Sequence, residues 1–172
     1  MTIEREMTRE FVNNAFAGES QAHMRYLLFA RRAEEEEMPN IARLFRAIAY
    51  AEMVHAGNHY RALGGMGETA DNIRVAIEGE THEVDEMYPV YKQAAHFQGE
   101  KEAETYAHYA LEAEKIHAEL YSRARTQAEK GRDMDLGTVY VCPVCGYTVE
   151  DDAPDCCPVC GAPGKRFRSF PA

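Results

Sequence analysis

The feature that most constrains this chain is a long run of helix-forming residues with few interruptions. Ala, Glu, Leu, Met, Arg and Lys dominate residues 1–130, and all of them favour helices. Residues that break or end helices occur at Pro39-Asn40, from Gly64 to Gly67, at Gln98-Gly99 and at Gly131. The breaks predict four long helices, with the approximate ranges 4–36, 40–63, 69–97 and 100–130.

These helices are predicted to pack together. Apolar residues recur at helical spacing, as in Ile41, Leu44, Phe45 and Ile48, which is typical of a helix with one buried face. Four long helices with short or moderate links describe a helical bundle. Pro89 lies inside the third predicted helix, and a proline there is expected to kink it.

The C-terminal segment has a different character. It contains two Cys-Pro-Val-Cys-Gly knuckles, the first at 142–146 and the second at 157–161. Each knuckle offers two thiolates, and four thiolates complete a tetrahedral metal site whose ligands are Cys142, Cys145, Cys157 and Cys160. The Pro and Gly of a knuckle let backbone N–H groups turn toward the sulfurs. The same four ligands suit iron or zinc.

The fifth cysteine, Cys156, directly precedes a ligand. It would fit the site only by lengthening its knuckle to Cys-x-x-x-Cys, so we expect Cys157 to be the ligand. After a short linker, the segment from Thr138 reads as a small β-rich module that is too small to fold without its ion. We therefore place a helical domain at 1–136 and a metal domain at 137–172.

The helices carry a second pattern of metal-binding residues, and it occurs twice. Glu52 and His55 form one Glu-x-x-His pair, and Glu114 and His117 form another, so each pair lies on one helix face. A single Glu precedes each pair on the helix before it: Glu19 by 33 residues and Glu80 by 34. Glu on two helices with Glu-x-x-His on two others is the ligand layout of ferritin-like di-iron bundles.

A fifth carboxylate breaks the duplication. Glu83 follows Glu80 by three residues, whereas the first hairpin has Ala22 at the equivalent position. The five carboxylates supply a charge of −5, which two divalent cations largely compensate. Buried carboxylates without such compensation would each cost several kcal/mol, about the penalty of an unpaired buried charge. The alternative interpretation is that Glu83 is simply exposed to solvent and does not bind metal.

Composition excludes several classes of function. The net charge of −10 argues against nucleic acid and against an anionic membrane surface. No apolar stretch is long enough for a signal peptide or a membrane span. Four of the five cysteines fall in the knuckles rather than in a disulfide framework, which favours the reducing cytoplasm.

Together these motifs resemble those of the rubrerythrin family. The likeness covers essentially the whole chain and rests on the paired knuckles and on the segments Gly18 to Tyr26, Gly79 to Glu83, Met87 to Pro89 and Glu114 to His117. The resemblance implies a mainly α fold, with a ferritin-like four-helix bundle followed by a small rubredoxin-like β-rich metal module. It also implies two non-haem irons in a di-iron centre and one Fe(Cys)₄ site per chain.

The resemblance further implies roles for single residues. The di-iron ligands would be Glu19, Glu52, Glu80, Glu114 and His117, with His55 and Glu83 exchanging on one iron between its oxidised and reduced states. Tyr26 and Tyr88 would hydrogen-bond to the ligand carboxylates.

The implied activity is reduction of hydrogen peroxide to water, as a defence against oxidative stress. Electrons would come from NAD(P)H through a separate rubredoxin reductase or a free rubredoxin, because the chain has no Gly-rich dinucleotide motif. We expect a homodimer or higher homo-oligomer in which the cysteine module of one chain serves the bundle of another. The alternatives are ferroxidase activity with iron storage, a di-iron oxygenase, and a metal or redox sensor.

Overall fold

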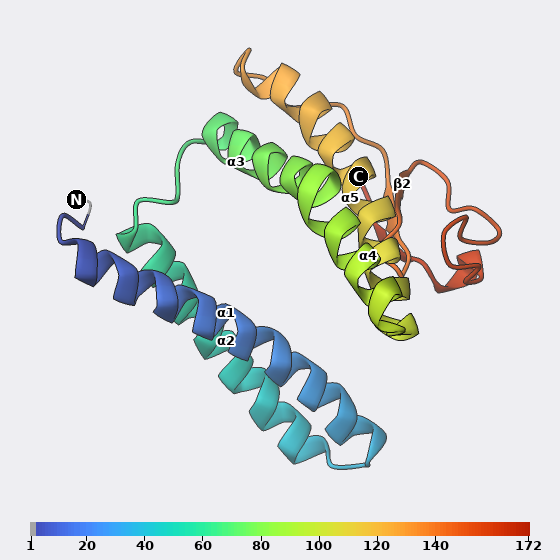
Figure 1. Cartoon of the computed structure of the whole chain (residues 1–172), viewed down its shortest axis with the longest axis horizontal. Coiled ribbons are helices and arrows are strands. Elements are labelled where there is room, and N and C mark those ends of the chain that lie inside the picture. Colours follow the sequence, from blue (N-terminus) through green and yellow to red (C-terminus); the bar gives the residue numbers. More distant parts are fainter. Residues whose placement is uncertain (1–2) are drawn as a thin grey trace. The chain divides into compact units, whose positions relative to one another are not determined.

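The computed structural model describes residues 3–172, which form two compact units. The first unit ends at Gly67 and the second comprises Glu68–Ala172. Their elements are labelled in Figure 1. Within residues 3–172, no helix is both long enough and apolar enough to cross a membrane.

The first unit is a hairpin of two long helices, α1 (Glu6–Glu35) and α2 (Pro39–Ala62). Pro39 begins α2, where its missing N–H costs nothing. The residues buried in this hairpin are all alanines: Ala22, Ala30, Ala33, Ala42, Ala49 and Ala56. Such small side chains let two helices approach closely. Larger apolar residues, among them Phe11, Leu28 and Leu44, remain exposed, so the hairpin does not cover its own apolar surface.

The second unit begins with another hairpin, made of one interrupted helix and one continuous helix. The interrupted helix consists of α3 (Thr69–His82), the π-helical segment η1 (Glu83–Met87) and α4 (Tyr88–Gln98). Gly99, with φ of 77°, ends α4, as is common for a left-handed helix cap. The continuous helix α5 (Lys101–Ala128) packs against α3 and α4. The four expected helical segments are thus present, with ends that differ by only a few residues.

The kink expected at Pro89 takes a specific form. Because proline lacks an N–H and crowds the carbonyl four residues earlier, regular α-helical bonding fails at this point. The chain widens into η1 just before Pro89, which then lies in the first turn of α4. A π-helical segment of this kind often marks a functional site, and this one begins at Glu83.

A small antiparallel sheet follows α5 in the same unit, and we call residues 137–172 the cysteine module. Its strands are β1 (Val139–Val141), β2 (Thr148–Glu150) and β3 (Arg168–Phe170), in the order β2-β1-β3. A 3₁₀ turn, η2 (Gly164–Arg166), precedes β3. The buried centre of the module consists of Cys142, Cys145, Cys157 and Ala162. A core made mainly of thiols supports the expectation that a metal nucleates this fold.

Candidate metal sites

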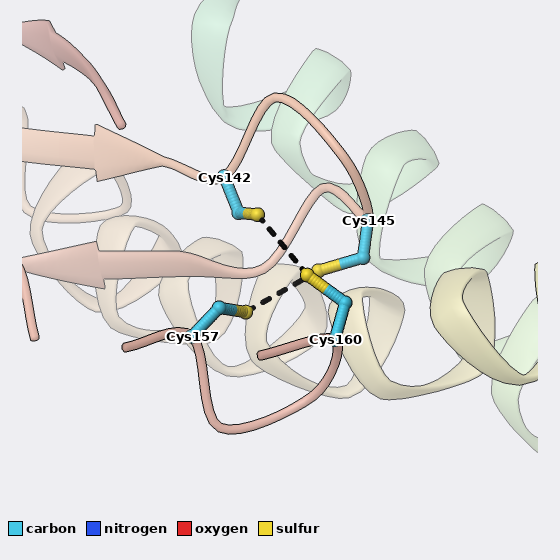
Figure 2. Close-up of side chains that lie close together, drawn as sticks. All are labelled: Cys142, Cys145, Cys157 and Cys160. Carbon is cyan, nitrogen blue, oxygen red and sulfur yellow. Dashed lines mark hydrogen bonds between the residues drawn. The ribbon is translucent and has the colours of Figure 1, made fainter. Parts of the chain in front are cut away.

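The four predicted cysteine ligands converge, as Figure 2 shows. One ligand atom from each lies within 4.8 Å of the others. The Cys142 and Cys160 sulfurs are 3.5 Å apart, and so are those of Cys145 and Cys157. A metal bonded to four sulfurs at about 2.3 Å in a tetrahedron needs sulfurs roughly 3.8 Å apart. The thiols are therefore already spaced for one tetrahedral ion.

The two knuckles have matching backbone geometry. The N–H of Gly146 donates to the carbonyl of Cys142 at 3.0 Å, and that of Gly161 donates to the carbonyl of Cys157 at 2.9 Å. These glycines have φ of 81° and 73°, which residues with side chains rarely adopt. Each Pro-Val-Cys-Gly turn thus holds its two thiols in the same way. Cys156 lies outside this repeat and is exposed.

The environment of the thiols favours a bound cation. Burial opposes ionisation of Cys142, but hydrogen bonds from the N–H groups of Val144 and Cys145 and from the thiols of Cys160 and Cys145 together lower the pKa to about 7. Burial raises the pKa of Cys145 and of Cys160. Because metal ligands must be thiolates, a cation is what would keep the more buried thiols ionised. The N–H contacts agree with the role that the sequence suggested for the knuckle turns.

The α1–α2 hairpin assembles the first half-site, which comprises Glu19, Glu52 and His55. Their ligand atoms lie within 4.8 Å of one another. His55 Nδ1 is 3.0 Å from Glu52 Oε2, as expected for residues three apart on a helix. This half-site holds two carboxylates and one imidazole without any contribution from the second unit.

A hydrogen bond that the sequence did not predict joins the two helices of this hairpin. His23 on α1 donates from Nδ1 to the carbonyl of Ala49 on α2 at 2.7 Å. Ala49 is fully buried and lies one turn before Glu52. His23 lies one turn after Glu19, so the bond ties the two helices together beside the half-site. The only sequence signal was the spacing between His23 and Glu19.

The α3–α5 hairpin assembles the second half-site, which comprises Glu80, Glu114 and His117. His117 Nδ1 is 2.6 Å from Glu114 Oε2 and 3.9 Å from Glu80 Oε2. Burial, a hydrogen bond with Glu114 and its charge raise the pKa of Glu80 to about 8. Two carboxylates so close cannot both ionise easily without a cation. The donor set therefore fits a metal ion.

Two further predicted residues lie near the second half-site. Glu83 is the first residue of η1. Burial and the charge of Glu114 raise the pKa of its carboxyl group. Burial and the charges of Glu83, Glu114 and Glu80 raise the pKa of the Tyr88 phenol. Neither residue belongs to the three-residue group. Tyr26, on α1, lies among aromatic rings, with its centroid 6.2 Å from those of Phe29 and Phe45.

The cysteine module contacts α5 of its own chain, close to the second half-site. Thr148 Oγ1 at the start of β2 is 3.0 Å from His117 Nε2. Arg123 of α5 donates to Glu150 of β2 at 2.7 Å, and Tyr109 of α5 packs against the cysteine core. A Cβ built on Gly146 would lie 3.6 Å from that of Ala113.

The module thus lies on α5 of its own chain. The expected homo-oligomer, in which the module of one chain serves the bundle of another, stays a prediction.

Comparison with known proteins matches both parts of the chain. A family model described as Rubrerythrin matches residues 10–125, and a model described as Rubrerythrin, rubredoxin-like domain matches residues 140–168. Rubrerythrin-2 of Clostridium acetobutylicum is 46% identical and is covered in full, with 99% of this chain aligned. Nigerythrin of Nitratidesulfovibrio vulgaris is 32% identical, over 95% of this chain and 86% of that protein.

Solved structures give the same result. The structure of nigerythrin in its fully reduced, all-ferrous state aligns with a TM-score of 0.55 and 31% identity. The alignment covers 95% of this chain and 86% of that one. The matched regions include both half-sites and all four cysteine ligands. The predicted fold class and cofactors are thus confirmed: the Glu and His groups of a di-iron site and a four-cysteine rubredoxin-like site.

Proposed function

The chain belongs to the rubrerythrin family, and on that premise we propose that it reduces hydrogen peroxide to water with electrons relayed through its own cysteine module. The observation that carries this proposal is the contact between the module and α5 beside the second half-site. A one-electron carrier next to a carboxylate-rich metal site suits a redox enzyme that must be reduced again after each turnover. Iron storage has no such need.

The electron and proton balance fits the two sites. Each hydrogen peroxide takes up two electrons and two protons and yields two waters. When bound, a pair of ferrous ions supplies both electrons at once, and a thiolate-bound iron supplies one at a time. The Tyr88 phenol keeps its proton, because burial and the nearby carboxylates raise its pKa. It can thus act as a hydrogen-bond donor.

We assign the ligands as the family resemblance implies. Glu19, Glu52, Glu80 and Glu114 hold the two irons together with His117, and His55 and Glu83 alternate on one of them. Each half-site supplies two carboxylates and one imidazole. Tyr26 and Tyr88 are assigned to support the ligand carboxylates. The domain boundary is placed between residues 136 and 137.

We assign the remaining partners on chemical grounds. The donor is a separate NAD(P)H-dependent rubredoxin reductase or a free rubredoxin, either of which delivers electrons to the cysteine module. We assign a homodimer or higher homo-oligomer on the family resemblance. Five unpaired cysteines favour the cytoplasm, where thiols stay reduced.

Stopped-flow spectroscopy tests the proposal. The iron-loaded, fully reduced protein is mixed with hydrogen peroxide under anaerobic conditions, and oxidation of both sites is followed. We expect one peroxide to oxidise the di-iron centre, after which the cysteine site becomes oxidised. With a reductase and NAD(P)H present, turnover should continue.

One variant and two alternative outcomes distinguish the proposed activity from iron storage and from an oxygenase. Cys157→Ser should react once with peroxide but should lose reductase-linked turnover. Growth of a mineral core with iron and dioxygen, without peroxide turnover, would instead indicate iron storage. Peroxide consumption that depends on an added organic substrate would indicate an oxygenase.

A further inference from the structure

The interface between α1 and α2 is packed with small side chains beside the first half-site. Its buried residues are all alanines, and uniform small side chains specify the relative position of two helices only weakly. Ring contacts such as that of Phe16 with Tyr60, whose centroids are 5.1 Å apart, bury apolar area, and apolar burial is not directional. A directional contact is therefore needed to fix one helix against the other.

Within the described part of the chain, α1 and α2 share two polar contacts. One is the ion pair of Arg46 with Glu34, whose side chains are 46% and 50% exposed, and such exposed pairs add little stability. The other is the bond from His23 Nδ1 to the Ala49 carbonyl at 2.7 Å. His23 is half-buried and Ala49 is fully buried, so water competes weakly for this second contact.

The bond lies one turn from the first half-site on both helices. His23 follows Glu19 by four residues, and Ala49 precedes Glu52 by three. Of the three residues in the half-site, Glu19 lies on α1, whereas Glu52 and His55 lie on α2. The pair on α2 is brought together by its own helix. Glu19 reaches that pair only through the way α1 lies on α2.

The second hairpin has a different residue at the equivalent position. Val84 follows Glu80 by four residues, as His23 follows Glu19. A valine side chain has no hydrogen-bond donor. The histidine is therefore a feature of the first hairpin alone and not part of the duplicated ligand pattern.

We propose that His23 is a positioning residue, whose bond to Ala49 holds Glu19 beside the Glu-x-x-His pair of α2. A carbonyl oxygen can only accept, so the bond requires a proton on Nδ1. The proposal rests on the proposed ligand set of the first half-site and is independent of the peroxidase activity.

Three variants separate the donor from the bulk of the side chain. His23→Asn places an amide N–H where Nδ1 was, because both nitrogens are bonded to Cγ. His23→Leu places a methyl group there, and His23→Gln carries its amide one bond further out. Leucine favours helices more than asparagine does. A role in helix stability alone therefore predicts that His23→Leu is the milder change, whereas positioning predicts that His23→Asn is.

The first measurement needs no metal. ¹⁵N-resolved NMR of the histidine rings reports which nitrogen of His23 carries a proton, and the signal is assigned by its loss in His23→Asn. We expect an Nδ1 proton that exchanges slowly, compared with the ring protons of His82, whose side chain is 59% exposed. An Nδ1 without a proton, or one that exchanges as fast as His82, would overturn the proposal.

The second measurement is a titration with cobalt(II) alone. Cobalt bound by thiolates and cobalt bound by carboxylates and histidines absorb differently, so the cysteine site is an internal control. At the carboxylate centre, affinity should fall about 10–100-fold in His23→Leu and His23→Gln, the range typical for loss of a residue that supports a ligand. His23→Asn should keep most of the affinity, and the cysteine site should bind equally in all variants.

An unchanged affinity in His23→Leu, or an equal loss in His23→Asn and His23→Leu, would overturn the positioning role. If His23→Leu did not fold, the comparison of His23→Asn with His23→Gln would decide in the same way. Failure of the natural protein to bind cobalt at the carboxylate centre would refute the proposed ligand set. Failure to react with peroxide would refute the proposed function and leave the role of His23 standing.

Discussion

The two helical hairpins present the same ligand pattern in different surroundings. Each supplies two carboxylates and one histidine within 4.8 Å. His55 of the first hairpin has a side chain that is 54% exposed, whereas that of His117 in the second is 29% exposed. His117 also bonds to Thr148 of the cysteine module. The two hairpins thus share the same ligand residue types, but the surroundings of their histidines differ.

The second hairpin differs in two further ways. It contains the π-helical segment that begins at Glu83, and its Glu80 has a pKa raised to about 8. The first hairpin is a pair of regular α-helices joined beside the half-site by the bond from His23 to Ala49. The two half-sites thus present the same residue types on helices of different regularity.

The largest expected effect comes from removing the glutamate of either Glu-x-x-His pair. Glu52→Ala and Glu114→Ala should each reduce iron from about three to about one per chain, because we expect neither cation of the centre to stay bound without these ligand carboxylates. Elemental analysis measures the loss. Glu112→Ala, on α5 but outside the half-site, is the control and should keep all three. If Glu114→Ala kept both metals of the di-iron centre, the two Glu-x-x-His pairs would not be equivalent in metal binding.

The next effect concerns the cysteine module, which packs on α5 of the second hairpin. Cys157→Ser should lose the visible absorption of the cysteine site and unfold the module, because the metal supports its fold. Hydrogen exchange should then rise in α5 around His117, which the module contacts. Cys156→Ser should retain the spectrum and the protection. If Cys156→Ser alone lost the spectrum, the ligand assignment would move to Cys156.

A smaller effect separates the two histidines. His55→Ala and Glu83→Ala should each lower peroxide turnover by about 10–100-fold, the range typical for altered support of a metal site. Both variants should keep two irons in the centre, since either group can hold the exchanging iron. His117→Ala should lose metal, because no substitute is proposed for its ring. Metal loss from His55→Ala would contradict the exchange of ligands.

The smallest effect is a pH dependence of the metal-free protein. Folded Glu80 holds its proton up to a pKa of about 8, compared with the ordinary value of 4.5. Between these values the folded state binds more protons than the unfolded state, so stability should fall as pH rises from about 5 to 8. Denaturant titrations followed by circular dichroism measure this slope. Glu80→Gln should flatten it, and Glu19→Gln serves as the matched control. A slope that persists in Glu80→Gln would assign it to other groups.

Much of both sites follows from local spacing. Residues three apart on a helix share a face, so Glu114 and His117 could be paired from the sequence alone, and their side chains meet at 2.6 Å. The geometry of the knuckles likewise depends on residues close together in the sequence, since Gly146 and Gly161 provide the positive φ that the turns require. The assignment of Glu83 and Tyr26 rests on resemblance, and their roles stay predictions.

The sequence by itself determined the helices, the two Glu-x-x-His pairs and the four cysteine ligands, because each depends on residues close together in the chain. Only the tertiary structure decided that the module lies on its own α5, that His23 bonds to Ala49, and that Thr148 meets His117. Thr148 and His117 are 31 residues apart, and no local rule relates such positions. Their contact depends on how β2 packs against α5, which is a property of the folded chain.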